Sequence, residues 1–349
     1  MEDIQIEKIK IGKNHKPFII AEMSGNHNQS LDRAIEIVEA AAKSGAHAIK
    51  LQTYTPDTMT INSRGGLFEI NDSNSLWNGR NLYELYQDAY TPWEWHEIIF
   101  KKANELGLIA FSSPFDEKAV DFLESLNVGA YKIASFENTD FPLLKKVAKT
   151  GKPVIMSTGV STIANIDEAV RLLREYGCKD IILLKCTSTY PSTPENTNLL
   201  TIPHLQELFN CHIGLSDHTM GIGAAIASVA LGARVIEKHF TLKRSEGGVD
   251  SAFSIEPKEL ESLVIESERA FLSLGKIQYG VQKIEKSSLA FKRSVYVVRD
   301  INVGEKFSSE NIRVIRPGNG LESKYYDIII GKESRYNISK GTPISWDLI

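Results

Sequence analysis

Residues 212–240 have the sequence HIGLSDHTMGIGAAIASVALGARVIEKHF and contain one complete strand–helix–strand unit. Two short, nearly continuous apolar runs, His212–His218 and Arg234–Phe240, enclose a polar turn and a helical segment, and Gly232 lies just before the second run. Continuous rather than alternating apolar runs are typical of parallel strands covered by helices. We therefore predict a β-α-β unit over this stretch.

The same unit recurs throughout residues 18–275. Ser30 is a candidate helix N-cap, Pro257 lies in the first turn of the last helix and Gly275 ends that helix. Eight such units most often close into a barrel, so we predict a (β/α)₈ TIM barrel over residues 1–277, with a doubly wound open sheet as the alternative. The six further strands are predicted at Phe18–Met23, Ala46–Thr53, Leu108–Ser113, Ala130–Ser135, Pro153–Thr158 and Asp180–Thr187.

Two segments depart from this pattern. Residues 55–90 are too long for an ordinary strand–helix loop and are rich in aromatic residues, so we predict a cover over the active site. Residues 278–290 are predicted to be a linker, and residues 291–349 a small β-rich domain. Its strands are predicted at Ser294–Val298, Ile312–Ile315 and Asp327–Gly331.

The composition excludes several classes of protein. The 349 residues are 42% hydrophobic and carry a formal net charge of −4, which gives no reason to expect nucleic acid or an anionic membrane as a partner. No apolar run is long enough for a transmembrane helix, and the N-terminus lacks the apolar region of a signal peptide. Cys178, Cys186 and Cys211 form no paired framework, so we expect buried, reduced cysteines in a cytoplasmic protein.

Polar and charged residues gather where the predicted strands end. In TIM barrels the catalytic groups come from the C-terminal ends of the strands, so this cluster predicts an enzyme and locates its active site. The residues are Glu22, Lys50, Gln52, Ser112, Ser113, Lys132, Ser135, Ser157, Thr158, Lys185, Thr187, Ser216, Asp217, His218, Glu237 and His239.

Two histidines predict a metal site. His218 and His239 end neighbouring strands, and two imidazoles that converge on one point suit a divalent first-row metal. The alternative is a hydrogen-bonded pair without metal. Glu22 ends the first strand, which adjoins the eighth in a closed barrel, and it could be a third ligand or a base.

Lysines at the same end of the barrel predict an anionic substrate. Lys50, Lys132 and Lys185 would place ammonium groups above the mouth, and nearby serines add neutral donors, which suits a phosphate plus a carboxylate. A competing hypothesis is a pyruvate aldolase in which one lysine forms an imine. A third is a sugar-binding protein without catalysis.

Seven motifs in order resemble the sialic acid synthase family, which condenses phosphoenolpyruvate with an aldose to form a nine-carbon 2-keto sugar acid. The resemblance covers essentially the whole chain, and residues 291–349 resemble the antifreeze-like (SAF) module of that family. The motifs are Ile19–Glu22 with Gly25–His27, Ile49–Gln52, Tyr131–Ile133, Cys186–Thr187 with Tyr190–Pro191, Gly214–His218, Glu237–Phe240 and Arg316–Gly320.

The resemblance implies roles for individual residues. His218 and His239 would hold a divalent metal, typically manganese, with magnesium or cobalt as alternatives, and together with Glu22 they would be the catalytic residues. Glu22 would also contact the sugar. The phosphoenolpyruvate site would be Lys50, Lys132, Ser135, Ser157 and Ser216, and the sugar site Gln52, Tyr190, Asp250 and Arg316. Arg316 would reach the barrel of the other subunit in a domain-swapped homodimer.

Within the family, the stretch from Ser75 to His96 resembles pseudaminic acid synthases. Ala134–Phe136 and Ser188 depart from the N-acetylneuraminate pattern, which has Pro-Ser-Gly and an asparagine at these places. The resemblance therefore implies 2,4-diacetamido-2,4,6-trideoxy-L-altrose as the N-acylated amino sugar and pseudaminic acid as the product. N-acetylneuraminate and legionaminic acid synthases are the alternatives.

Overall fold

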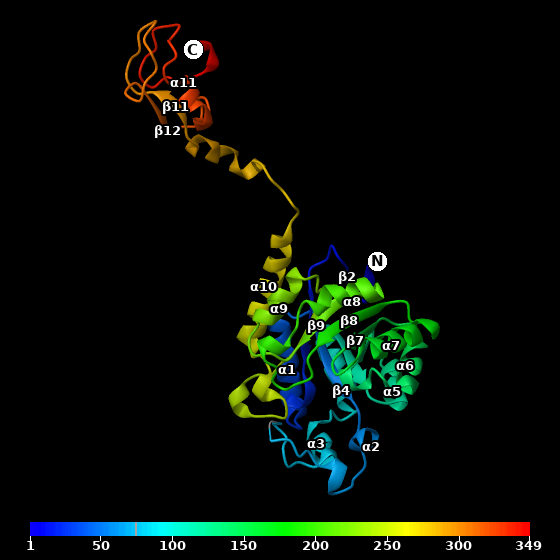
Figure 1. The fold of residues 1–349 in the computed structure, drawn as a ribbon. Helices are drawn as coiled ribbons and strands as arrows, with labels where there is room; N and C mark the ends of the chain where they lie inside the picture. Colours follow the sequence, from blue (N-terminus) through cyan, green and yellow to red (C-terminus); the bar gives the residue numbers. More distant parts are fainter. Residues whose placement is uncertain (74) are drawn as a thin grey trace. The chain divides into compact units, whose positions relative to one another are not determined.

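The computed structural model describes residues 1–73 and 75–349 and contains eight parallel strands closed into a barrel (Figure 1). The strands are β3 Phe18–Glu22, β4 Ala48–Thr53, β5 Ile109–Pro114, β6 Tyr131–Ile133, β7 Val154–Ser157, β8 Ile181–Cys186, β9 His212–Asp217 and β10 Val235–His239. The last strand pairs with the first, Val235 opposite Phe18. The predicted TIM barrel is therefore confirmed and the open sheet is wrong.

One helix follows each strand of the barrel along the chain and packs on its outer surface. Ser30 caps the first of them by accepting a hydrogen bond from the backbone N–H of Arg33, and Pro257 begins the last. The helices are α1 Leu31–Lys43, α4 Trp95–Glu105, α5 Glu117–Ser125, α6 Phe141–Ala148, α7 Ile163–Glu175, α8 Thr201–Phe209, α9 Gly223–Ala230 and α10 Pro257–Leu274. Among the residues described, no helix is long and apolar enough to cross a membrane.

Gly214 allows β9 and β10 to lie close together. A Cβ atom at this position would be 2.1 Å from the backbone oxygen of Val235, which no side chain can accommodate. Any other residue at position 214 would therefore push the two strands apart. Because these are the strands that lead to His218 and His239, the separation of the histidines depends on this glycine.

A β-hairpin at the N-terminus was not predicted from the sequence. Strands β1 (Ile4–Ile6) and β2 (Ile9–Ile11) pair antiparallel, and Ile4, Ile6 and Ile11 are buried while Ile9 is half-buried. The His212 ring lies 2.7 Å from the backbone oxygen of Glu2, at the residue that begins β9. The hairpin therefore closes the N-terminal end of the barrel and leaves the opposite end for the site (Figure 1).

The predicted cover, residues 55–90, is folded in all its described parts. It contains α2 (Pro56–Met59), a short 3₁₀ turn and α3 (Leu82–Ala89), and Asn81 caps α3 through a hydrogen bond from the N–H of Tyr83. It lies at the end of the barrel away from the N-terminal hairpin (Figure 1). The cover therefore extends from the C-terminal end of β4, as the sequence predicts.

The chain divides into two compact units, Met1–Gly275 and Lys276–Ile349. In the second unit β11 (Ser294–Val297) and β12 (Ile312–Ile315) pair antiparallel, close to their predicted bounds. The strand predicted at Asp327–Gly331 is wrong, because α11 (Tyr326–Ile329) is helical there. Only Ile329 of this apolar run is fully buried, and it packs with Tyr325 and Tyr326, a spacing of three and four residues that a helix provides and a strand does not.

Candidate active site

A cavity of about 370 Å³ opens at the C-terminal ends of the barrel strands. The strand-end cluster supplies much of its lining, and the cover contributes the rest. Of the twelve residues predicted for the site, eleven line this cavity: Glu22, Lys50, Gln52, Lys132, Ser135, Ser157, Tyr190, Ser216, His218, His239 and Asp250. The twelfth, Arg316, follows β12 in the second unit, where its side chain is exposed.

Two buried lysines form one half of the cavity. Lys50 Nζ lies 2.7 Å from Glu22 Oε2 and donates to Ser113 Oγ, while Lys132 Nζ donates to Ser157 Oγ at 2.8 Å. Both lysines are almost fully inaccessible, so each holds its ammonium group against a network of oxygens. Lys185 is not part of this group. Side chains alternate along β8, so that of Lys185 points away from the inside of the barrel, and it donates to Thr187 Oγ1.

Glu237 links the two lysines; it belongs to the predicted strand-end cluster, but the sequence assigned it no role in the site. Its Oε1 atom lies 3.8 Å from Lys50 Nζ and 3.5 Å from Lys132 Nζ. Burial alone would raise the pKa of Glu237, but the two ammonium groups hold it below its ordinary value. Burial lowers the pKa of Lys132, whereas the carboxylates of Glu22 and Glu237 outweigh burial and raise that of Lys50.

His218 and His239 form the other half. Their ring centroids are 5.3 Å apart. The His218 Nδ1 atom lies 2.9 Å from the backbone oxygen of Thr187, and His239 Nδ1 lies 3.5 Å from Asp250 Oδ2. A carbonyl oxygen only accepts, so Nδ1 carries the proton in a neutral His218 ring and Nε2 keeps the free electron pair. His239 Nδ1 faces Asp250 but makes no hydrogen bond within the part of the chain that the structure describes.

No third acidic, cysteine or histidine side chain joins this pair within residues 1–73 and 75–349 in an arrangement that could hold a metal. Glu22 instead faces the lysine half, where Gln52 Nε2 donates to its Oε1 atom at 2.8 Å. Its other oxygen pairs with Lys50, and burial raises its pKa. Glu22 therefore lies with the lysines, an arrangement that favours the hypothesis of a proton-handling group over that of a third metal ligand.

Glu137 is a further carboxyl of the cavity, and it was not predicted from the sequence. It lies in a 3₁₀ turn just after β6, and its Oε2 atom is buried without a hydrogen-bond partner. Burial raises the pKa of Glu137 to about 7, although the nearby ammonium group of Lys132 opposes the shift. A carboxyl with this pKa exchanges protons at neutral pH.

Gly159 and Cys186 were also not predicted as part of the site. The N–H of Gly159 donates to Ser135 Oγ, and a Cβ atom there would meet Ser188 Oγ at 2.1 Å. Cys186 lies 3.9 Å from His218 Nδ1, and although burial favours the thiol, His218 lowers the pKa of Cys186 to about 6. All three cysteines are free and buried, as predicted.

Aromatic and aliphatic side chains from the cover and from the ends of β4 and β5 form a further wall of the cavity. Tyr54, which follows β4, has its ring centroid 5.8 Å from that of Tyr86 and 5.2 Å from that of Phe115, which follows β5. Leu82 and Leu85 of α3 complete this wall. The site therefore joins an anion-binding half, a histidine half and an apolar wall.

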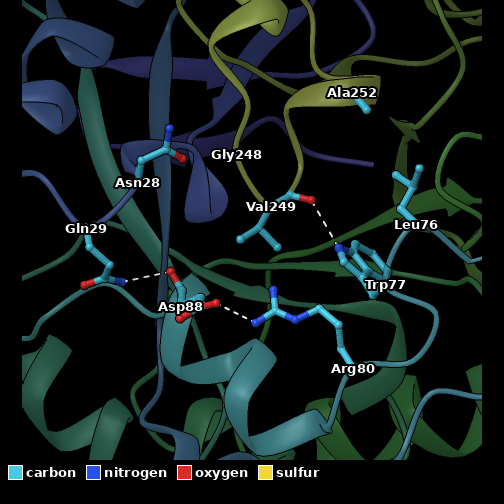
Figure 2. A pocket seen from close by; sticks show the side chains of 9 residues that line it. All are labelled: Asn28, Gln29, Leu76, Trp77, Arg80, Asp88, Gly248, Val249 and Ala252. Atoms are coloured by element: carbon cyan, nitrogen blue, oxygen red, sulfur yellow. Dashed lines mark hydrogen bonds and ion pairs between the residues drawn. The ribbon is translucent and has the colours of Figure 1, made fainter.

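Trp77 of the cover lines both this cavity and an outer one of about 530 Å³, whose lining residues are drawn in Figure 2. Its indole N–H donates to the backbone oxygen of Val249, next to Asp250, and its ring lies 5.7 Å from that of Tyr190. Arg80 pairs with Asp88 on the far side of the outer cavity (Figure 2). The cover is thus bonded to the loop that carries Asp250.

A closed parallel barrel with a polar cavity at its C-terminal face is the architecture of TIM-barrel enzymes. Residues 37–279 match the NeuB family and residues 292–349 match the SAF domain. The chain belongs to the NeuB family, which confirms the resemblance found in the motifs.

Three known proteins show the extent of this similarity. The chain is 45% identical to the pseudaminic acid synthase of Helicobacter pylori, over 95% of this chain and 97% of that protein. It is 44% identical to the pseudaminic acid synthase of Campylobacter jejuni, over 93% and 94% of the two chains. The crystal structure of an N-acetylneuraminic acid synthetase from Leptospira borgpetersenii in complex with citrate is 32% identical, with a TM-score of 0.74 over 82% of this chain and 95% of that one.

Proposed function

We propose that this protein is a pseudaminic acid synthase, which condenses phosphoenolpyruvate, 2,4-diacetamido-2,4,6-trideoxy-L-altrose and water to give pseudaminic acid and phosphate. The observation that carries the proposal is a single cavity that places Lys50 and Lys132 beside His218 and His239. The identity of the product rests on the two relatives of that name, which this chain matches over nearly its whole length.

Phosphoenolpyruvate would bind in the lysine half. The ammonium groups of Lys50 and Lys132 match a ligand that carries both a phosphate and a carboxylate, and Ser135, Ser157 and Ser216 add hydroxyl donors. Burial already disfavours the charged form of Lys132, so an incoming anion would restore it. The binding energy of phosphoenolpyruvate would thus come from its attraction to buried ammonium groups, which water screens little.

The residues of the histidine half fit a divalent metal. Both Nδ1 atoms face acceptors, which leaves two Nε2 electron pairs as ligands, and water or sugar oxygens would complete the coordination. The described lining contains two lysines and four carboxyl groups, Glu22, Glu137, Glu237 and Asp250. The formal balance is −2 with every group charged and −1 when Glu137 is protonated, and either value favours a cation before any anionic substrate enters. We assign Mn²⁺, with Mg²⁺ or Co²⁺ as alternatives. A bound metal would polarise the sugar aldehyde as a Lewis acid.

The reaction moves protons at three oxygens. Carbon 3 of phosphoenolpyruvate forms a bond to the aldehyde carbon, whose oxygen gains a proton. Water adds at carbon 2 and loses a proton, and the resulting hydroxyl then gives its remaining proton to the departing phosphate as the C–O bond breaks, which leaves the 2-keto acid and hydrogen phosphate. Glu22 and Glu137 are the carboxyls placed to exchange these protons, and we assign Glu137, with its pKa near 7, as the base for the water.

The apolar wall favours a deoxygenated, N-acetylated sugar. Tyr54, Leu82 and Leu85 can cover the C6 methyl and the acetyl methyl groups, and each buried methyl or methylene group contributes about 0.8 kcal/mol. A hydroxyl in place of the C6 hydrogen would lack a partner against this wall. Gln52, Tyr190 and Asp250 would bind the polar face of the sugar.

Arg316 would complete the site from a second subunit. In its own unit its side chain is exposed. Phe136 lines the cavity and yet 61% of its surface is exposed, so one barrel by itself leaves the mouth partly uncovered. We propose a homodimer in which the partner's C-terminal domain covers this mouth and Arg316 contacts an N-acyl group.

Phosphate release tests the function and its alternatives. With phosphoenolpyruvate present, the pseudaminic precursor should release phosphate faster than the legionaminic precursor or N-acetylmannosamine. Faster release with either of the others would reassign the product. In ¹⁸O-water the label should appear in the sugar acid, and label in phosphate would contradict C–O cleavage.

A lysine-imine aldolase is the second candidate, favoured by the lowered pKa of Lys132, because a neutral amine is nucleophilic. Borohydride in the presence of pyruvate would then trap an adduct on Lys132 and inactivate the protein. The synthase mechanism predicts no adduct and loss of activity with EDTA. A protein that only binds sugar would release no phosphate with any of the three sugars.

A further inference from the structure

A buried ion pair lies on the outer face of the barrel wall, next to the two histidines in sequence. Asp217 and Lys238 stand opposite each other in the pairing of β9 with β10, and Lys238 Nζ lies 2.8 Å from Asp217 Oδ2. The two side chains are 0% and 1% exposed. Side chains alternate along a strand, so this pair points away from the cavity that His218 and His239 line.

Thr219 joins the pair from the other side of His218. Lys238 Nζ donates to the backbone oxygen of Thr219 at 2.7 Å. Asp217 Oδ1 accepts from both the backbone N–H and the hydroxyl of Thr219, at 2.9 and 2.8 Å. Asp217, Thr219 and Lys238 therefore form one cluster. Asp217 and Thr219, which flank His218, are both bonded to Lys238, the residue before His239.

The backbone around His218 has few other constraints. His218 lies one residue beyond the end of β9. Its backbone oxygen accepts from the N–H of Ser192, and its ring contacts the oxygen of Thr187, and both of these partners belong to a loop. Cys186 of β8 contacts the ring, with its Sγ atom 3.9 Å from Nδ1. The cluster is thus the link that ties the chain on both sides of His218 to β10.

A need for stability does not explain this pair. Desolvation of two charges offsets most of their attraction, and apolar side chains of similar volume often replace a buried ion pair without loss of stability. Directed hydrogen bonds, in contrast, define positions that apolar packing leaves adjustable. A pair that fixes geometry is expected where small displacements matter.

We propose that the Asp217–Thr219–Lys238 cluster is a positioning element that sets the separation of the His218 and His239 rings and thereby the affinity of that pair for a divalent cation. The part that concerns the cation rests on the metal role proposed above. The part that concerns the rings does not.

The test removes the pair without leaving a buried charge. The double variant Asp217→Leu/Lys238→Met is compared with Lys238→Met, which leaves Asp217 unpaired. The control Asp121→Leu/Lys146→Met removes an ion pair between the outer helices α5 and α6, whose two residues do not line the cavity. Crystal structures of the metal-free proteins give the ring separation. Titration with Co²⁺, followed by its visible absorption, gives the affinity, and calorimetry gives phosphoenolpyruvate binding.

We expect the double variant to unfold cooperatively, to bind phosphoenolpyruvate like the wild type, to lose the 5.3 Å ring separation and to bind Co²⁺ roughly 10–100-fold more weakly. A double variant that keeps this separation overturns the proposal, whatever its Co²⁺ affinity. Loss of cooperative unfolding in both variants also overturns it, because the cluster would then be a requirement of folding. If the wild type binds no Co²⁺ but the rings move in the variant, the metal role fails and the positioning role stands.

Discussion

Glu137 illustrates how position along the chain conceals a functional side chain. Strand-end residues can be identified from an apolar run, but Glu137 lies in a 3₁₀ turn after β6 and is buried by parts of the fold distant in sequence. The groups that face it include Lys132, Lys50 and Asp140, together with the rings of Tyr86 and Tyr190. The one signal in the sequence is a carboxyl two residues after Ser135, which is too common to indicate a role.

The proposed base role of Glu137 predicts a pH dependence. If Glu137 accepts a proton from water, kcat should rise with pH through about 7, where the carboxyl ionises. In Glu137→Gln this limb should disappear and kcat should fall at every pH. The exposed Glu105→Gln is the control and should keep the wild-type profile. A wild-type limb that persists in Glu137→Gln would contradict the assignment.

The same raised pKa predicts a gain in stability from this substitution. A carboxyl whose pKa rises on folding contributes stability that is present below its unfolded pKa and is lost as pH increases through its folded pKa of about 7. At pH 8 Glu137→Gln should therefore raise the free energy of unfolding by roughly 1–3 kcal/mol, and at pH 4 the difference should vanish. Urea denaturation at both pH values measures this, and equal differences at both would contradict it.

His218 carries the metal prediction at the same scale. His218→Ala should weaken Co²⁺ binding by more than about 100-fold, because the substitution removes a metal ligand and not merely a group that orients one. It should also abolish synthesis while the barrel still melts cooperatively. His204→Ala, on the exposed face of α8, should leave both measurements unchanged. Full activity of His218→Ala would refute the assignment.

At the scale of elements, the cover connects substrate selection to the histidine half. Trp77 bonds to Val249, and the next residue, Asp250, faces His239 Nδ1. The sequence indicates a cover from its length and aromatic content, but not which residue attaches it. This hydrogen bond joins residues that are 172 positions apart, so no local sequence pattern indicates it.

Trp77→Phe keeps the apolar ring and removes the hydrogen bond to Val249. One hydrogen bond contributes about 0.5–1.5 kcal/mol, so KM for the sugar should rise roughly 2–10-fold while KM for phosphoenolpyruvate stays constant. Tyr83→Phe, which removes only an exposed contact of α3 with Asp57, serves as the control. Equal changes in both KM values would show that Trp77 acts on the whole site rather than on the sugar.

At the scale of the whole molecule, the site is predicted to need two chains. Arg316→Ala should impair use of the sugar more than binding of phosphoenolpyruvate. If Arg316 acts on the partner's barrel, mixing Arg316→Ala with Lys132→Ala after mild dissociation should restore activity. Random pairing makes about half of the dimers hybrid, each with one intact site, so about a quarter of wild-type activity is expected. No recovery would place Arg316 within its own chain's site or outside catalysis.

The amino-acid sequence by itself determined the barrel, because eight apolar runs separated by helices leave few ways to bury both faces of each strand. It also determined which side chains stand at the strand ends, since alternation and strand direction place nine of the eleven predicted lining residues at one mouth, while Tyr190 and Asp250 were implied by the family resemblance. The tertiary structure alone decided the rest: that Glu22 pairs with Lys50 rather than the histidines, that Glu237 bridges two lysines, and that Glu137 lies buried beside them. These facts depend on distances across the barrel and on burial by remote segments, and such quantities exist only once the chain has closed on itself.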